Sequence, residues 1–205
     1  ILLSLPDLSS KMKRTILIIC TLIIASATTY GQKNNTALLL IDIQDFYFSG
    51  GKSELVEPDK AALNAAKILA EFRRTGQTVI FVCHRSGSQS EINKSVEPLP
   101  GENIIYKDAV NSFVGTGLLE FLTSKNIKSL VICGMQTHMC VEAAVRAASD
   151  LGFGCTLIHD ACATKDLDFH GIKIKASDVH FSTLATLKNY SLVISSAEYL
   201  DSKKE

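Results

Sequence analysis

Residues 132–152 read ICGMQTHMCVEAAVRAASDLG and carry the clearest structural pattern in the chain. An apolar, strand-like run ends at Gly134, and a helical pattern follows over residues 137–150. A strand that leads directly into a helix is the repeating unit of an α/β protein. Thr137 is expected to be the N-cap of this helix, which places Cys140 at about its third position.

The same alternation of strand and helix runs through the rest of the chain. Strands that are apolar along their whole length are covered on both faces, as in a parallel sheet between helices. The pattern therefore predicts one α/β domain over residues 32–205. Strands are predicted at 36–43, 78–84, 103–107, 129–134, 155–161 and 191–196, and helices at 58–74, 116–126, 137–150 and 176–190.

Residues 1–31 are expected to lie outside this domain. Met12 is followed by two basic residues, an apolar run of about ten residues and then small residues, which is the pattern of a secretory signal peptide. The apolar run is short for a transmembrane helix. We expect the natural start at Met12, cleavage between Ala27 and Gln32, and a periplasmic or secreted mature protein. The alternatives are an uncleaved anchor, or a cytoplasmic protein if this segment is not a signal peptide.

The composition limits the partners and the cofactors. The chain has 21 basic and 21 acidic residues, so it gives no support for nucleic acid or an anionic membrane as a partner. Six cysteines are present, and removal of Cys20 with the predicted signal peptide leaves five. An odd number leaves at least one free thiol in an exported protein. No CxxC pair occurs, so a structural zinc site has no support.

Polar residues stand at the carboxyl ends of three predicted strands. Asp42 lies inside the apolar run ALLLIDI, Lys107 ends NIIYK, and Cys140 follows the strand that ends at Gly134. Ligands of parallel sheets bind beyond these strand ends, so we expect the three side chains to meet at one edge. A buried carboxylate is costly unless it is paired, and Lys107 is the expected partner of Asp42.

In a thiol hydrolase, each of these three side chains can have a separate catalytic role. The helix N-terminus and the Lys107 ammonium are expected to lower the pKa of Cys140, and free N–H groups in the first turn can receive an oxyanion. Asp42 can take the thiol proton and return it to the leaving group. The alternative is a structural ion pair that closes the strand ends, with Cys140 packed in the core.

At these positions the sequence resembles the isochorismatase-like cysteine hydrolases, a superfamily that includes nicotinamidases and N-carbamoylsarcosine amidases. The matching segments are ALLLIDIQDF, YKDAVNSF, VICGMQTHMCVEAAVRAASDLGF and LIHDACATKD. The resemblance implies a three-layer α/β/α fold with a six-stranded parallel sheet, and Asp42, Lys107 and Cys140 as a catalytic triad. It also implies a cis peptide between Met135 and Gln136, which turns the N–H groups of Gln136 and Cys140 toward the substrate oxygen. It further implies a homo-oligomer, a dimer or higher.

The sequence departs from the nicotinamidases of this superfamily at their metal site. These enzymes carry an Asp-x-His motif and a second histidine, whereas VCHRSGSQS follows the second predicted strand here. His84 alone is a poor metal site, and we expect neither a metal nor a cofactor. The resemblance and the thiol together favour hydrolysis of a small amide, carbamoyl or lactam-type C–N bond through an acyl-enzyme. The alternatives are a vinyl-ether hydrolase of the isochorismatase type, and a redox or ligand-binding protein on the same fold.

Five further residues follow the predicted strands closely enough to line a substrate pocket. They lie in the segments after the first, third and fourth strands, and each has packing in a loop as its alternative role. They are Gln44, Phe48, Asn111, Phe113 and Thr137.

Overall fold

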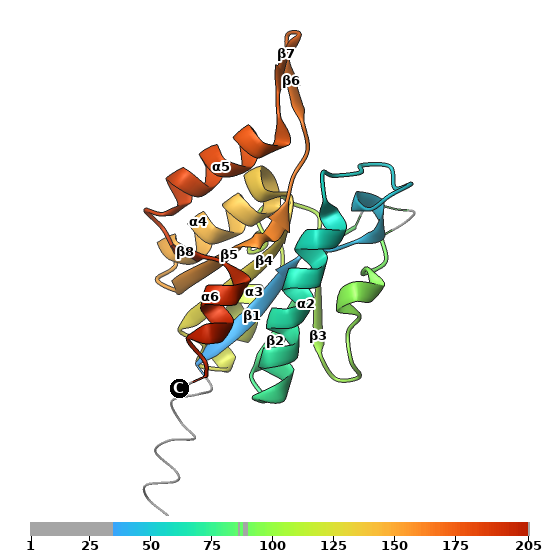
Figure 1. The fold of residues 1–205 in the computed structure, drawn as a ribbon. Coiled ribbons are helices and arrows are strands. Elements are labelled where there is room, and N and C mark those ends of the chain that lie inside the picture. Colours follow the sequence, from blue (N-terminus) through green and yellow to red (C-terminus); the bar gives the residue numbers. More distant parts are fainter. Residues whose placement is uncertain (1–34, 86, 88–89, 205) are drawn as a thin grey trace, which may run out of the picture. The chain divides into compact units, whose positions relative to one another are not determined.

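The computed structural model describes residues 35–85, 87 and 90–204 of the chain (Figure 1). The predicted signal peptide and its cleavage region lie outside these residues. Residues 35–205 form one compact unit. Over the described ranges, no helix has both the length and the apolar character needed to cross a membrane.

A six-stranded parallel sheet forms the centre of this unit, as the resemblance implied. Its strand order is β3-β2-β1-β4-β5-β8, so the order reverses between β1 and β4. The connections that leave the two strands at such a reversal run to opposite faces of the sheet, and parallel sheets bind ligands in the crevice between them, beyond the carboxyl ends of the strands. The strands are β1 (Thr36–Ile41), β2 (Thr78–His84), β3 (Asn103–Lys107), β4 (Ser129–Met135), β5 (Gly154–Ala163) and β8 (Leu192–Ile194).

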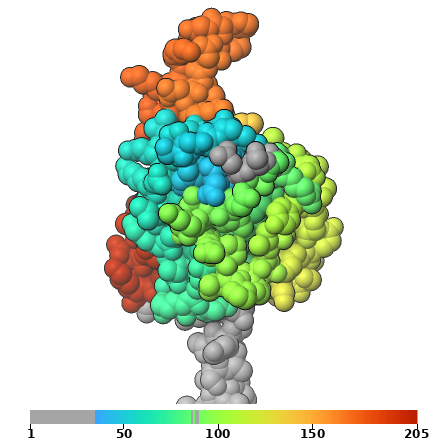
Figure 2. All heavy atoms as spheres, turned by 90° about the vertical axis from the view of Figure 1, so that its right-hand side faces the viewer, coloured from blue at the N-terminus to red at the C-terminus, as the bar shows by residue number. Residues whose placement is uncertain are grey.

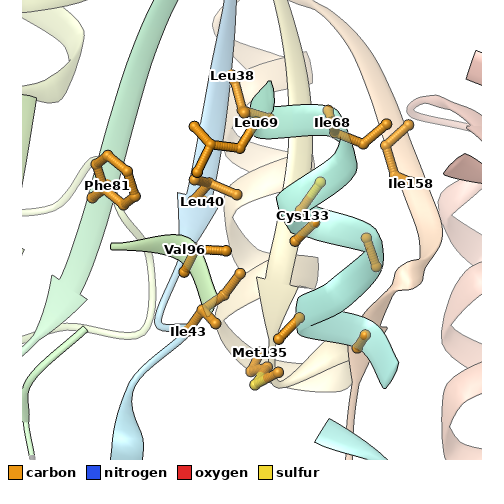
Figure 3. Packing of buried hydrophobic residues seen from close by; sticks show 14 of the residues in the cluster. Leu38, Leu40, Ile43, Ile68, Leu69, Phe81, Val96, Cys133, Met135 and Ile158 are labelled. Atoms are coloured by element: carbon orange, nitrogen blue, oxygen red, sulfur yellow. The ribbon is translucent and has the colours of Figure 1, made fainter. Parts of the chain in front are cut away.

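Helices cover both faces of the sheet and complete the three layers (Figure 1). Alternate residues of β1 point into two separate cores: Leu38 and Leu40 face α2 and α6, whereas Leu39 and Ile41 face α3, α4 and α5. Figure 3 shows the first core, where Ile68 and Leu69 of α2 pack over the sheet. The helices are α2 (Pro58–Arg74), α3 (Leu118–Ser124), α4 (Glu142–Asp150), α5 (Ala176–Leu187) and α6 (Ser196–Asp201).

The helix predicted over residues 137–150 begins differently from the expectation. A π-helical turn, η3 (Thr137–Val141), comes first, and α4 follows it. The prediction of Thr137 as N-cap is wrong. Its side chain makes no capping bond, because its hydroxyl donates to the Ala163 carbonyl at the end of β5. Cys140 therefore lies in a π-helical turn that is held by the neighbouring strand.

Two short elements were absent from the prediction. An antiparallel hairpin, β6 (Leu167–Phe169) with β7 (Ile172–Ile174), follows β5 and stands out from the rest of the unit (Figure 2). Helix α6 takes the last residues of the predicted strand 191–196, because Ser195 and Glu198 form a reciprocal capping box that starts a helix there.

Candidate active site

The two strands on either side of the reversal touch closely at their carboxyl ends. Gly134 of β4 lies opposite Ile41 of β1 and has a φ of 138°. A Cβ at this position would overlap the backbone of Ile41, so only glycine fits. This close approach brings the segment after β4, with Cys140, beside Asp42, which follows β1.

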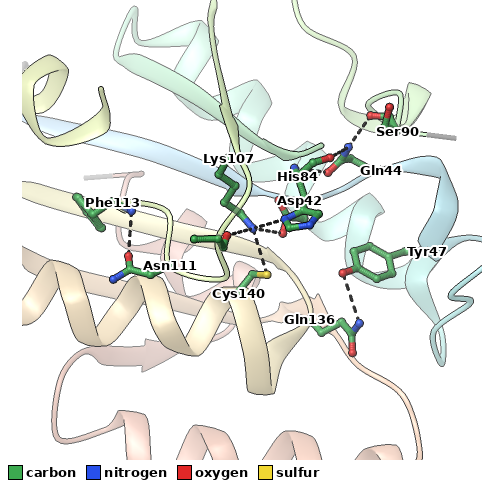
Figure 4. Close-up of polar contacts among 11 residues, drawn as sticks. Asp42, Gln44, Tyr47, His84, Ser90, Lys107, Asn111, Phe113, Gln136 and Cys140 are labelled. Atoms are coloured by element: carbon green, nitrogen blue, oxygen red, sulfur yellow. Dashed lines mark hydrogen bonds and ion pairs between the residues drawn. The ribbon is translucent and has the colours of Figure 1, made fainter. Parts of the chain in front are cut away.

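Asp42, Lys107 and Cys140 meet at this point, although they are far apart in the sequence (Figure 4). Lys107 Nζ lies 2.8 Å from Asp42 Oδ2 and 3.2 Å from Cys140 Sγ. All three side chains are buried, and those of Asp42 and Lys107 are fully so. A buried ion pair with a thiol against its cation is a costly arrangement for a purely structural purpose.

The Lys107 ammonium has two further neighbours that fix its position. It donates to the Ala109 carbonyl over 3.2 Å, and His84 Nδ1 lies 3.4 Å away. Because an ammonium has no acceptor, a hydrogen bond to His84 requires the lone pair on Nδ1. His84 lies opposite Lys107 in the β2–β3 pairing, which brings its ring next to the ammonium.

The pKa of the Cys140 thiol differs from the sequence-based expectation. The pKa is raised to about 12, mainly by burial and then by the negative charge of Asp42, against the smaller lowering effect of the Lys107 charge. The prediction of a lowered pKa is therefore wrong. Burial also raises the pKa of Asp42, against the opposing effect of Lys107.

One proton is therefore shared between two buried acids beside one cation. With the proton on sulfur, the group consists of a carboxylate, an ammonium and a thiol. With the proton on Asp42, it consists of a carboxylic acid, an ammonium and a thiolate. Both states have zero net charge, whereas loss of this proton to solvent would leave an unbalanced buried charge. Proton transfer from Cys140 to Asp42 would therefore give a thiolate without changing the net charge of this buried group.

Gln136 follows a cis peptide bond with Met135 and lies directly before the turn that carries Cys140. Its Nε2 donates to Tyr47 Oη over 3.4 Å, and its Oε1 is buried without a hydrogen-bond partner among the described residues. Tyr47 belongs to a short 3-10 helix, η1 (Asp45–Tyr47), directly after β1. Sequence reasoning missed Tyr47, although the aromatic run DFYF beside Asp42 was a signal that could have found it.

The five predicted pocket residues are all held by contacts within the protein. Gln44 bonds the backbone of His84 with both ends of its amide, and its Nε2 also donates to the Ser90 carbonyl. Phe48 belongs to the core under α2, and Asn111 Oδ1 accepts from the Phe113 N–H.

The other two pocket candidates pack against neighbouring elements. The Phe113 ring stacks on Phe153, with 6.3 Å between the ring centroids. The Thr137 hydroxyl lies 2.9 Å from His180 Nδ1, in addition to its bond to Ala163. Each of the five therefore has a packing or hydrogen-bond partner within the protein.

A separate cavity of about 320 Å³ lies between α2, the end of β5 and α5. Cys162 and His180 line it, together with His159 and Asp160, but none of Asp42, Lys107 and Cys140 does. Across the part of the chain that the structure describes, no group of three or more potential ligand side chains is arranged to hold a metal ion.

The fold and the site define an α/β protein with a buried Cys–Lys–Asp group at the reversal of its sheet. The family model "Isochorismatase domain" matches residues 36–189, which include all three of these residues. The chain belongs to the isochorismatase family and is a hydrolase of that family.

Known proteins similar to this chain support this membership. The isochorismatase family protein YddQ of Bacillus subtilis is 41% identical over 174 residues, which are 80% of this chain and 97% of YddQ. The crystal structure of an isochorismatase hydrolase from Oleispira antarctica is 43% identical with a TM-score of 0.79, and the match covers 82% of this chain and 97% of that one. Streptothricin hydrolase of Streptomyces noursei is 31% identical over 140 residues, covering 64% of this chain and 50% of that enzyme.

Proposed function

We propose that this protein hydrolyses a C–N bond in a small amide, carbamoyl or lactam-type compound, with Cys140 as the nucleophile. The observation that carries this proposal is the position of Lys107 Nζ, within 2.8 Å of Asp42 Oδ2 and 3.2 Å of Cys140 Sγ. One cation thus lies against both the nucleophile and the base, where it can stabilise the thiolate that forms during acyl transfer.

In the first half of the proposed reaction, Cys140 Sγ attacks the acyl carbon while its proton passes to Asp42. The new S–C bond gives a tetrahedral intermediate with a negative oxygen. Asp42 then gives the proton to the leaving nitrogen, the C–N bond breaks, and a thioester remains on Cys140. Lys107 stays protonated and offsets the charge that moves between the sulfur and Asp42.

The second half repeats these steps with water. Asp42 takes a proton from a water molecule, whose oxygen attacks the thioester carbon. When this second intermediate collapses, the S–C bond breaks, the acid product leaves, and the proton returns from Asp42 to Cys140. In both halves, we assign the backbone N–H groups of Gln136 and Cys140 to the oxyanion, as the family resemblance implies, because Gln136 directly precedes the turn that carries Cys140.

The thiol itself supports an acyl substrate over a vinyl ether. A thiolate readily forms a covalent intermediate at an acyl carbon, whereas cleavage of a vinyl ether needs no such intermediate. The similarity to streptothricin hydrolase supports hydrolysis of a small molecule as the reaction class.

Replacement of the nucleophile tests this proposal. Cys140→Ala and Cys140→Ser should each lose at least about 10⁴-fold in kcat on any small amide that the wild type cleaves. Cys155→Ala is the matched control, since Cys155 is also buried but bonds only to backbone carbonyls near α4 and β5. Activity of Cys140→Ala at the wild-type rate would show that Cys140 is not the nucleophile. A resting wild-type protein whose mass shows a stably oxidised Cys140 would favour the redox alternative.

We also propose that the protein acts as a homo-oligomer after export. The pattern over residues 12–31 supports export. The β6–β7 hairpin supports oligomerisation, because a two-stranded hairpin is marginally stable by itself and this one exposes 64% of Phe169 and 63% of Ile172 (Figure 2). Phe181 of α5, the helix that follows the hairpin, is also 63% exposed.

A further inference from the structure

Tyr47 and Gln136 form a buried polar pair beside the proposed nucleophile. Both side chains are more than nine-tenths buried, and the Gln136 amide donates to the Tyr47 hydroxyl. We propose that this pair recognises the N–H and C=O groups of a carboxamide or ureido substrate. The inference rests on the proposed function and narrows its substrate class.

Some of the hydrogen-bond donors and acceptors of Tyr47 and Gln136 have no partner among the described residues. Gln136 Oε1 has no donor among the described residues, and the only contact of Tyr47 Oη there is the one it accepts from Gln136. The pair therefore presents one free acceptor, Oε1, and two free donors, the phenol proton and the second hydrogen of Nε2. A buried polar atom without a partner costs about 1–3 kcal/mol, so such atoms mark a place where a ligand or water binds.

The conclusion does not depend on which way the Gln136 amide is turned. In the opposite orientation, Oε1 accepts the phenol proton. The pair then presents the Nε2 hydrogens as donors and the Tyr47 oxygen as acceptor. Either orientation offers at least one donor next to one acceptor, which is the pattern that an amide complements.

The pair lies at the reactive group and not at a distance from it. In Figure 4, the Cys140 thiol lies between the Lys107 ammonium and the Tyr47–Gln136 pair. The charges of Asp42 and Cys140 both raise the pKa of Tyr47, in addition to the larger effect of burial. The raised pKa keeps Tyr47 a neutral phenol, able to donate, at neutral pH.

This arrangement discriminates by chemical class. A carboxamide or ureido group can satisfy a free donor and the free acceptor at once. An ester has no N–H for the free acceptor. A carboxylate also has no N–H, and it would bring a negative charge next to Asp42.

Alkylation of Cys140 tests this inference without a known substrate. Iodoacetamide and methyl iodoacetate have similar sizes and the same leaving group, but only the first has an amide. We would measure both second-order rates at Cys140 by mass spectrometry of peptides, and divide their ratio by the ratio for glutathione. In wild-type protein, the rate ratio of iodoacetamide to methyl iodoacetate at Cys140 should be about 3- to 10-fold higher than the same ratio for glutathione, as expected from one or two hydrogen bonds. Tyr47→Phe and Gln136→Met should each reduce this preference toward that of glutathione.

Tyr106→Phe is the matched control, because Tyr106 is exposed and its ring lies over Arg85. Its ratio should equal that of the wild type. A wild-type ratio equal to that of glutathione, or a preference that survives both pair variants, overturns the inference and leaves the nucleophile in place. If neither reagent modifies Cys140 in wild-type protein, the nucleophile assignment fails and this inference fails with it.

Discussion

The Lys107 ammonium lies 2.8 Å from the Asp42 carboxylate, and solvent reaches neither side chain. Two opposite charges in such a place depend on each other, because removal of one leaves the other buried without compensation. The thiol of Cys140 depends on both, since each changes its pKa in an opposite direction. The stability and the activity of the protein are therefore linked through Lys107.

Lys107→Met should reduce both properties. Loss of the ammonium leaves the Asp42 carboxylate unpaired, which should lower the free energy of unfolding by about 3–5 kcal/mol in urea denaturation. Activity should fall at least about 100-fold, because the thiolate loses its counter-ion. Lys125→Met, at an exposed position after α3, should change neither measurement. A Lys107→Met protein as stable as the wild type would contradict the buried ion pair.

The pH dependence of Cys140 alkylation should follow Asp42 and not a free thiol. The pKa of Asp42 is raised, so on acidification this carboxylate is protonated at a higher pH than an ordinary aspartate. Its function as a base should be lost at that pH. At higher pH the rate should stay level through pH 8–9, where a free cysteine titrates, since the pKa of Cys140 is about 12. Iodoacetamide rates between pH 4 and 11 check this profile. A step near pH 8.5 would show an ordinary thiol.

Asp42→Asn should change the same profile in a defined direction. The negative charge of Asp42 raises the pKa of Cys140, whereas Lys107 lowers it. Removal of the charge leaves Lys107 unopposed, so the pKa of Cys140 should fall below that of the wild type while turnover is lost with the base. Alkylation against pH and an assay of hydrolysis separate the two effects. A Cys140 pKa that rises in this variant would contradict the charge balance.

Gly134→Ala should be more harmful than an ordinary glycine substitution. Its φ is positive, and the added Cβ meets the backbone of Ile41. We expect a loss of about 3 kcal/mol in the free energy of unfolding. Gly76→Ala is the control, because Gly76 also has a positive φ but open space around it, and it should cost about 1 kcal/mol. Equal losses in the two variants would exclude a steric role for Gly134.

The double variant Phe169→Ser and Ile172→Ser should dissociate the proposed oligomer. Both side chains are exposed on the hairpin, and their replacement removes its apolar surface. Light scattering after size exclusion should show a lower mass than the wild type. Leu63→Ser on α2, where Leu63 is 59% exposed, should leave the mass unchanged. A monomeric wild type would overturn the oligomer.

The sequence predicted the sheet well because its strands are apolar over their whole length. The predicted bounds of β2, β3 and α2 match the structure, and all six strands were found. The hairpin was missed because each of its strands has only three residues and no buried face to give a pattern. The meeting of Asp42 with Lys107 followed from a simple rule, since both stand at carboxyl ends of strands in one parallel sheet.

Other features of the site depend on the folded surroundings. The pKa of Cys140 is a sum of burial and two opposing charges, and the sequence shows the charges but not the burial. The Thr137 hydroxyl bonds to β5, which lies 26 residues further along the chain, so local capping rules failed there. The contact between Tyr47 and Gln136 spans 89 residues and exists only because η1 folds over the end of β4.

The contact between Gly134 and Ile41 also limits how this enzyme can change over evolution. With β1 and β4 paired in register and backbone against backbone at this point, the sheet sets the spacing between Asp42 and the segment that carries Cys140. A change of substrate specificity is then expected in the loops that follow the strands. Insertions after β1, β2 or β5 can change these loops without moving Asp42, Lys107 and Cys140.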